Sequence, residues 1–159
     1  MKKAMLLCAA ILSIAAMTAC KSGGEYDNYE PQKKDGKWGL VDTNGLFVVE
    51  PIWDGMGFYG DGIWPVERNG KCGAINTKGE VVVALEYEQV GQFVDGVAPV
   101  KQNNHWGYVD KKGKLVIPLI YDSALIFCNG VGFSGHTGIV WAGGEMLGIR
   151  KDGTTFPLK

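Results

Sequence analysis

Acidic side chains recur at two fixed positions along the chain, and they are the residues that could most readily do chemistry. Asp54, Glu88 and Asp122 share one position, and Asp42 and Asp110 share the other. Two carboxylates ~5–9.5 Å apart can hydrolyse a glycosidic bond, and carboxylate oxygens also bind calcium. Aspartate equally accepts hydrogen bonds from the backbone amides of turns. Because a repeated residue is generally a repeated structural part, we interpret both sets as turn caps.

Three other patterns approach a catalytic or cofactor motif without the context that it needs. Residues 55–60 spell G-x-G-x-x-G, but a dinucleotide site requires this pattern between a strand and a helix. Ser134 lies in a pattern close to a nucleophile elbow that lacks its second glycine. His105 and His136 have no acidic or thiol partner at zinc-ligand spacing. We therefore expect no catalytic residue, no metal site and no cofactor, and hence no enzyme.

The elements that must position these residues follow a repeat of 34 residues. Three sets of residues show this spacing: Trp38, Cys72 and Trp106; Gly39, Gly73 and Gly107; and Pro31, Pro65 and Pro99. Complete units run over about 37–70, 71–104 and 105–138, with partial units at both ends. In the trailing one, Leu147-Gly148-Ile149 restarts the pattern about seven residues late, so we expect an inserted loop within Gly135–Glu145.

Within a unit, the residue pattern predicts strands joined by short turns. KWGLVD alternates with period two, and Asn44-Gly45 is a hairpin signal before LFVVEP. A third strand contains Pro65, which lacks an N–H donor and should lie at a sheet edge or a bulge. The connection before it could form one helical turn in residues 86–90 and 121–126. We expect an all-β antiparallel meander, solenoid-like or propeller-like, and open because closed propellers need four or more four-stranded blades.

These units resemble the WG-repeat (KWG-repeat) proteins of bacteria. KWGLVDTNG and HWGYVDKKG are similar to the family's first motif, and FVDGVAPV and FCNGVGFS are similar to its second. Cys72 and Asn76 depart from the tryptophan and aspartate of that pattern. The resemblance implies a repeat domain of β-strands over residues 29–159. It implies no activity, because the family hosts no single chemistry.

Tryptophans divide into those that follow the repeat and those that break it. Trp38 and Trp106 are expected to insert between neighbouring units, with Gly39 and Gly107 allowing close approach of the backbone. Three tryptophans break the pattern: Trp53, Trp64 and Trp141. Both core packing and exposure remain open for them; if exposed, they form the candidate surface for binding a sugar ring or a partner's pocket. If Trp64 is exposed, Trp106→Ala should destabilise the fold more than Trp64→Ala.

The N-terminus carries the features of a bacterial export signal. Residues 1–19 are a positive segment and an apolar run too short to span a membrane, as in a secretory signal peptide. Met17-Thr18-Ala19-Cys20 resembles the lipobox, which implies that Cys20 becomes the lipidated first residue. Several acyl chains would anchor the protein stably. Ordinary secretion after Ala19 is the alternative. The polar, glycine-rich residues 20–28 predict a flexible tether.

The net charge bears on whether the protein binds nucleic acid, and the cysteine content bears on whether it contains a disulfide. The formal net charge is −1, whereas nucleic-acid-binding proteins normally show a basic stripe, so we expect no nucleic acid. Cys72 and Cys128 remain after signal removal, in a compartment that permits disulfides. Whether they pair is open, and we expect two small buried apolar side chains.

The sequence thus favours a lipid-anchored protein of the bacterial envelope, at the outer membrane, acting as a non-catalytic module that binds an envelope protein or glycan. An envelope hydrolase acting on carbohydrate or peptide, and a structural spacer without a specific ligand, are the alternatives. An active site needs unlike titratable groups in one pocket, whereas this chain repeats like residues in like places. Residues at both ends would protect open sheet edges, so we expect a monomer: Pro31, Lys33, Lys34, Pro157 and Lys159.

Overall fold

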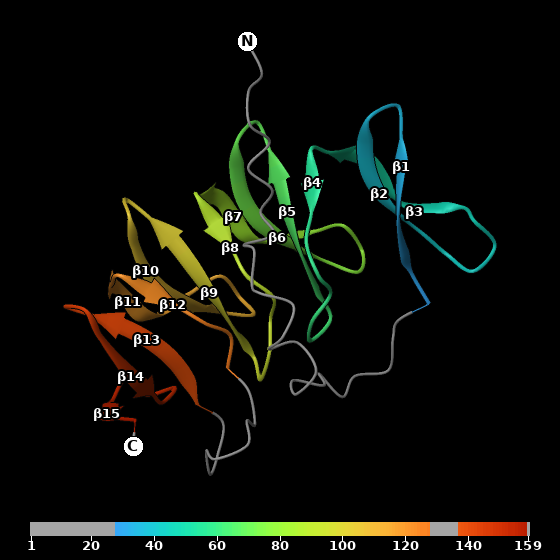
Figure 1. Ribbon diagram of the computed structural model, residues 1–159. Helices are drawn as coiled ribbons and strands as arrows, with labels where there is room; N and C mark the ends of the chain where they lie inside the picture. The colour runs from blue at the N-terminus through green and yellow to red at the C-terminus, as the bar shows by residue number, and fades with distance from the viewer. Residues whose placement is uncertain (1–27, 128–136, 159) are drawn as a thin grey trace.

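The computed structural model describes residues 28–127 and 137–158, and every regular element in these ranges is a β-strand (Figure 1). The first sheet contains β1 (Glu30–Lys34), β2 (Lys37–Val41) and β3 (Phe47–Trp53). The second contains β4 (Gly55–Met56), β5 (Ile63–Arg68), β6 (Lys71–Asn76) and β7 (Val81–Tyr87). The third contains β8 (Gln89–Val90), β9 (Val97–Gln102), β10 (His105–Asp110) and β11 (Leu115–Tyr121). The fourth contains β12 (Ser123–Ala124), β13 (Gly138–Ala142), β14 (Glu145–Ile149) and β15 (Thr155–Pro157).

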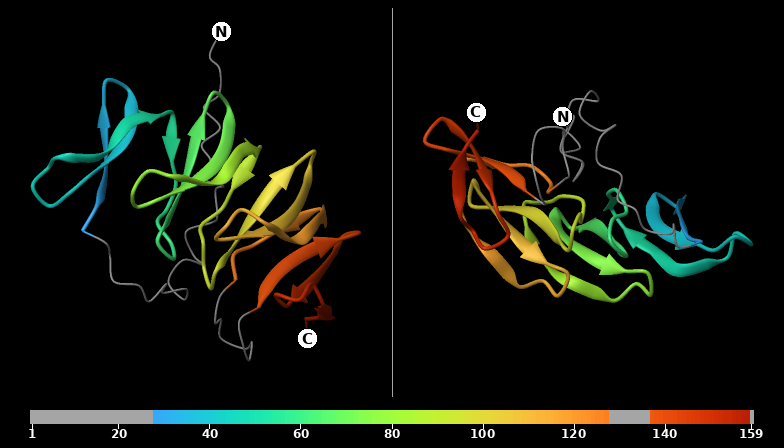
Figure 2. Two further views of the ribbon diagram at one scale, coloured as in Figure 1. Left: turned by 180° about the vertical axis from the view of Figure 1, so that it is seen from behind. Right: turned by 90° about the horizontal axis from the view of Figure 1, so that it is seen from below.

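Each sheet is antiparallel, with its strands in chain order, and none closes on itself. Figure 2 shows the four sheets following one another along an open, curved row. The predicted all-β open array is therefore confirmed. The sequence units straddle two sheets each, because the sheet boundaries fall after Trp53, Tyr87 and Tyr121.

The expectation of three strands per unit, with a helical turn in the connection, is wrong. The connections contain the two-residue strands β4, β8 and β12, which make the last three sheets four-stranded. The backbone of each connection forms hydrogen bonds with the first long strand of the next sheet. The N–H of Asp54 donates to the carbonyl of Glu67 at 2.8 Å, and that of Gly57 donates to the carbonyl of Pro65 at 2.8 Å. A helical turn would leave these strand carbonyls unpaired.

The repeated prolines occupy one register position but not one environment. Pro31, Pro65 and Pro99 face Leu40, Ala74 and Tyr108 on the neighbouring strand. Pro31 lies on the edge strand β1, as expected, whereas Pro65 and Pro99 lie in the interior strands β5 and β9. The interior position is tolerated because the register pairs of β4 end with Met56 and Val66, so that beyond them only the carbonyl of Pro65 is needed, and it accepts from the N–H of Gly57.

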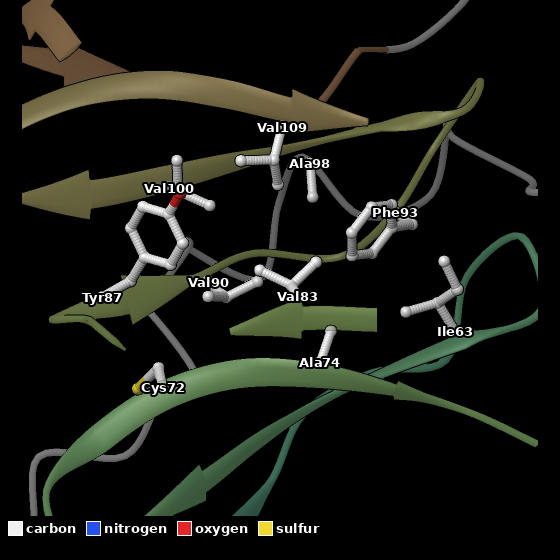
Figure 3. Close-up of a cluster of buried hydrophobic side chains, with 10 residues drawn as sticks. All are labelled: Ile63, Cys72, Ala74, Val83, Tyr87, Val90, Phe93, Ala98, Val100 and Val109. Carbon is white, nitrogen blue, oxygen red and sulfur yellow. The ribbon is translucent and has the colours of Figure 1, made fainter. Parts of the chain in front are cut away.

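Apolar side chains form three clusters, each shared by two successive sheets. Leu40, Val49 and Trp53 of the first sheet pack with Trp64, Val66 and Ile75 of the second. Ten residues of the second and third sheets form the next cluster, which Figure 3 draws. Val97, Tyr108, Ile117 and Tyr121 of the third sheet pack with Val140 and Ile149 of the fourth. Each sheet is thus stabilised by burial against its chain neighbours, as in repeat proteins.

Turn residues explain the hairpins. The hairpins β1–β2, β5–β6, β9–β10 and β13–β14 have two-residue turns in which both residues have positive φ: Asp35-Gly36, Asn69-Gly70, Asn103-Asn104 and Gly143-Gly144. The predicted hairpin at Asn44-Gly45 is present, but only Gly45 has positive φ, at 76°. The N–H of Gly45 donates to the carbonyl of Asp42 at 2.9 Å, which makes a four-residue turn ending in a left-handed glycine.

The fourth sheet corrects two details of the predicted trailing unit. Met146 pairs with Trp141 as Trp106 pairs with Lys101, so Met146 and not Leu147 occupies the tryptophan position. The loop expected within Gly135–Glu145 is wrong from Gly138 onward, because that stretch is the β13–β14 hairpin. The additional residues therefore fall within 128–136, outside the described ranges, together with most of the FCNGVGFS motif.

Candidate functional site

The glycines beside the repeated tryptophan position allow two strands to approach closely. A Cβ on Gly39 would lie 2.4 Å from the carbonyl oxygen of Val49, and one on Gly107 would lie 2.4 Å from that of Ile117. The register shifts at both places, which brings the neighbouring strand inward. Trp38 and Trp106 are half-buried and pack against the first and third clusters. The expected close approach is confirmed, while the tryptophan rings line the margins of the cores rather than their centres.

Asp42 and Asp110 are turn caps. Asp42 Oδ1 accepts hydrogen bonds from the N–H groups of Asn44 at 2.9 Å and Leu46 at 3.0 Å. Asp110 Oδ1 accepts from Lys112 at 2.8 Å and Lys114 at 2.9 Å. The hydrogen bond from Leu46 is the main cause that lowers the pKa of Asp42. These carboxylates cap the turn between the first two strands of their units, β2–β3 and β10–β11.

The second acidic set caps turns in a different sheet. Asp54 Oδ2 accepts from the N–H of Asn69 at 2.7 Å, Glu88 Oε1 accepts from that of Asn103 at 2.8 Å, and Asp122 Oδ2 accepts from that of Gly143 at 2.8 Å. Each of these residues therefore follows the last strand of one sheet, and its carboxylate caps the hairpin turn of the next sheet.

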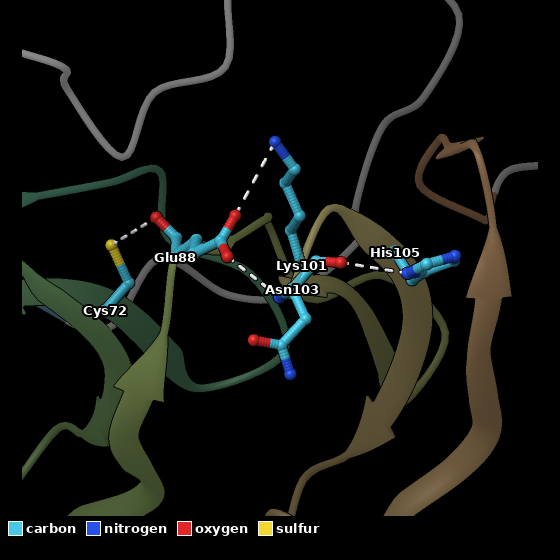
Figure 4. A network of polar contacts seen from close by, with 5 residues as sticks. All are labelled: Cys72, Glu88, Lys101, Asn103 and His105. Atoms are coloured by element: carbon cyan, nitrogen blue, oxygen red, sulfur yellow. Dashed lines mark hydrogen bonds and ion pairs between the residues drawn. The ribbon is translucent and has the colours of Figure 1, made fainter.

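Cations complete two of these junctions. Lys37 forms an ion pair with Asp54, and Lys101 Nζ lies 3.6 Å from Glu88 Oε2 (Figure 4). The hydrogen bond from Lys37, followed by that from Asn69, lowers the pKa of the Asp54 carboxyl. Both acidic sets are thus turn caps, as predicted, but the second set also ties successive sheets together.

Comparison with protein families decides what the repeat is. A family model described as a WG-containing repeat matches three consecutive segments, residues 38–72, 73–105 and 106–133. The chain belongs to the WG-repeat family. A search of the curated proteins and a search of the solved structures find no match.

Two of the three tryptophans that break the WG repeat are buried, so they form no binding surface. The exposed fractions are 3% for Trp53 and 7% for Trp64. Trp53 occupies the position of the buried Tyr87, and the ring of Trp64 lies 5.1 Å from that of Tyr59. Neither indole N–H has a hydrogen-bond partner. Trp141 is half-buried and, of these three tryptophans, is the one with part of its surface accessible to solvent.

The patterns that approached a metal or cofactor motif form no such site in the described part of the WG repeats. No group of three or more His, Cys, Asp or Glu side chains there could hold a metal ion. Residues 55–60 form β4 and an irregular segment without a following helix. His105 is exposed on a hairpin tip, with Nδ1 2.9 Å from the carbonyl oxygen of Asn103. Ser134 and His136 lie outside the described residues.

Cys72 takes the WG tryptophan position in the second unit. Its side chain is buried, and its sulfur lies 3.4 Å from the carbonyl oxygen of Glu88 (Figure 4). The expected burial is confirmed, and the pairing that the sequence left open is decided for this residue: Cys72 is disulfide-bonded. Cys20 and residues 1–19, the predicted signal peptide, lie outside the described residues. No helix among residues 28–127 and 137–158 has the length and apolar character needed to cross a membrane.

The WG repeats expose apolar side chains that the sequence analysis missed. Val48 and Ile52 on β3 are 42% and 43% exposed, and Val116 and Ile120 on β11 are 37% and 60% exposed. We call these four residues the outer-strand surface, because β3 and β11 are the last strands of their sheets. Val116 and Ile120 occupy the repeat positions of Val48 and Ile52. Apolar residues on both faces of the predicted strand LFVVEP were the available signal.

Proposed function

We propose that this WG-repeat protein is a lipid-anchored component of the bacterial envelope, at the outer membrane, whose array binds an envelope protein and catalyses no reaction. The observation that carries the proposal is the outer-strand surface. Exposed apolar side chains that gather on a surface mark sites of protein interaction, and β3 and β11 each expose two of them at the same repeat positions. Their strands are also sheet edges, to which an extended partner segment can add by backbone hydrogen bonds.

Burial of the tryptophans favours a protein partner over a glycan. Trp53 and Trp64 are enclosed between two sheets and present no face for a sugar ring. Trp141 keeps the glycan alternative open, because its ring is partly exposed. A hydrolase gains no support from the acidic residues, since both sets serve as turn caps. A spacer without a ligand would not need the outer-strand surface.

The test replaces apolar residues of the outer-strand surface by glutamate, which the second unit already has at the same repeat position. The repeat position of Ile52 and Ile120 is occupied by Glu86 in the second unit, so Ile52→Glu and Ile120→Glu should fold. Purified protein is cross-linked to envelope extract, and captured proteins are quantified by mass spectrometry. The double variant should lose the specific capture, whereas Thr43→Glu, on an exposed turn, should keep it. Equal capture by both variants would exclude the outer-strand surface.

The lipid anchor has its own test. Cys20→Ser should abolish lipidation, so that the protein is left unprocessed or is no longer held in the membrane fraction by acyl chains. Intact mass and membrane fractionation measure both effects. A wild-type mass without acyl chains, starting after Ala19, would instead establish ordinary secretion.

A further inference from the structure

The last strands of the first three sheets, β3, β7 and β11, expose alternate side chains that differ from strand to strand. Each strip consists of four alternate residues at the same repeat positions, starting just before the strand. The strips are Leu46, Val48, Glu50 and Ile52 for β3; Glu80, Val82, Ala84 and Glu86 for β7; and Lys114, Val116, Pro118 and Ile120 for β11. Val82 is half-buried, and the other members are exposed. The three strips can therefore be compared position by position.

The β3 and β11 strips contain the outer-strand surface but carry opposite charges. The β3 strip has Glu50 and no cation, whereas the β11 strip has Lys114 and no carboxylate. The β7 strip has a carboxylate at each end, Glu80 and Glu86. The β11 strip is thus the one that combines exposed apolar side chains with a positive charge.

The turn that leads into β11 adds two further cations. Lys111 and Lys112 are exposed beside Lys114, and Asp110 is the single carboxylate among residues 110–114. Its Oδ1 accepts from the backbone N–H groups of Lys112 and Lys114. Within residues 28–127 and 137–158, none of these three lysines forms an ion pair. Their ammonium groups are therefore available to a partner.

The backbone that carries these lysines is held in place by the second sheet. A Cβ on Gly113 would lie 2.5 Å from the carbonyl oxygen of Val82, so the turn rests directly against β7. The N–H of Gly113 also donates to the carbonyl of Asp110 at 3.0 Å. Because this backbone is already ordered, binding a partner requires little further loss of conformational freedom.

We propose that the β11 strip and the turn at residues 110–114 bind an extended segment of an envelope protein in which acidic residues flank apolar ones. The inference rests on the proposed function and specifies the chemistry of the partner. Val116 and Ile120 are separated by about 13 Å along a strand. An extended segment with apolar side chains four positions apart can contact both. Acidic side chains at its end then lie beside Lys112 and Lys114, where opposite charges set its orientation.

The β3 strip rejects the same segment. Glu50 lies among its apolar residues, and Asp42 begins the turn that precedes it. Both carboxylates repel acidic side chains, and a repulsive element of this kind gives specificity. The two halves of the outer-strand surface therefore differ in the segment that they accept.

A bilayer with anionic lipids is the other surface that attracts lysines beside apolar residues. Faces that enter the membrane interface commonly carry Trp, Phe or Leu. The β11 strip has none of these, since its apolar members are Val116, Pro118 and Ile120. Its short side chains on a flat strand favour a protein segment.

Defined peptides test the charge preference. The probe is a fluorescent peptide of five alternating valines and threonines, beginning and ending with valine, with two aspartates at each end. The control peptide has lysines in place of the aspartates. Anisotropy with the full chain, purified from bacterial membranes in detergent, should show at least about tenfold tighter binding of the aspartate peptide. About 0.5 M NaCl should remove most of that difference. Equal affinities at low salt would overturn the proposal.

Two lysine pairs make matched variants. Lys112→Gln with Lys114→Gln should weaken binding of the aspartate peptide by about tenfold. Lys71→Gln with Lys78→Gln removes as many exposed charges from the second unit and should leave the affinity unchanged. Equal weakening by both pairs would show a general attraction to cations and would overturn the proposal. The Tm of each variant, compared with that of wild type, establishes that it is folded.

Single glutamate variants identify the strand. Ile120→Glu should abolish binding of the aspartate peptide, whereas Ile52→Glu should leave it unchanged. Equal effects would overturn the assignment to β11. If the two substitutions together abolish capture of envelope proteins while the two peptides bind equally, the proposed function stands and this inference fails.

Vesicles of phosphatidylglycerol test the membrane. The full chain with Cys20→Ser, which lacks the acyl anchor, should not sediment with them. Sedimentation that is lost on Lys112→Gln with Lys114→Gln, together with no binding of the aspartate peptide, would overturn the proposal and assign the β11 strip to the bilayer.

Discussion

At the residue scale, the repeat position of Trp64 and Ala98 lies between two sheets, and the size of its side chain differs from one pair of sheets to the next. Trp64 fills that space between the first and second sheets, whereas its equivalent Ala98 lies between the second and third. Both side chains are buried, so both interfaces are closed at this position, although one is filled by a tryptophan and the other by an alanine. The tryptophan of the WG pair lies at the margin, and Trp106 is only half-buried.

Trp64→Ala should therefore cost about 3–5 kcal/mol of unfolding free energy, since a large buried ring is removed and a cavity remains. Trp106→Ala should cost less, because its side chain is partly exposed to solvent already. This order reverses the one expected from the repeat pattern. Denaturant titration of both variants measures it, and a larger loss for Trp106→Ala would contradict the burial described here.

Gly107→Ala tests the close approach of strands at the WG glycine. Its Cβ would lie 2.4 Å from the carbonyl oxygen of Ile117, so the strands must separate and about 1–3 kcal/mol should be lost. Gly55→Ala is the control, because its Cβ would meet only the Glu67 side chain, at 3.2 Å. Equal unfolding free energies for the two variants would show that the strands separate without cost.

At the element scale, the acidic junctions connect the hairpin tip of one sheet to the end of the sheet before it, in addition to the packing of their shared core. Asp54 follows β3, caps the β5–β6 tip at Asn69 and pairs with Lys37 of β2. A second contact joins the opposite ends of the sheets, where the N–H of Gly96 donates to Asp61 Oδ2 at 2.6 Å. This contact joins the second and third sheets, which Glu88 and Asn103 connect at the hairpin-tip end, so these two sheets are held at both ends of their shared core.

The Asp54 junction should weaken in acid. Because the folded state lowers the pKa of Asp54 from 3.8, its stabilising effect is present above that value and is lost as the pH falls through the folded pKa. The Tm difference between wild type and Asp54→Asn should therefore be greatest near neutral pH and shrink below pH 3.8. Glu50→Gln, on the exposed side of β3, should change the Tm little at any pH. A Tm difference independent of pH would exclude the ionised junction.

At the scale of the whole molecule, the two end sheets carry features that terminate the array. Glu30 and Gln32 occupy the positions at which the second sheet has the buried Trp64 and Val66. At the other end, the ring of Phe156 covers Gly148, where a Cβ would lie 2.3 Å from its Cζ. The guanidinium of Arg150 lies 4.5 Å from the centre of the same ring. Polar or self-covered end faces disfavour stacking of further copies.

The protein should therefore be a monomer. Pro31, Lys33 and Lys34 lie on the edge strand β1, and Pro157 lies on the edge strand β15, where they disfavour pairing between chains. Light scattering of the purified protein over a range of concentrations measures its mass. A dimer or ring that persists on dilution would show that the end sheets complete one another across chains.

The sequence by itself determined the strand type, the repeat and its turns, because these depend on neighbouring residues that recur every 34 positions. Gly45, Asp42 and Asp110 act locally, and their roles could be predicted. The tertiary structure alone decided the sheet boundaries and the burial of Trp53 and Trp64. A two-residue strand such as β4 has no periodicity to detect, and its hydrogen bonds are made to the next strand. Exposure of a side chain depends on whether another sheet covers it, and that is settled only when the sheets pack.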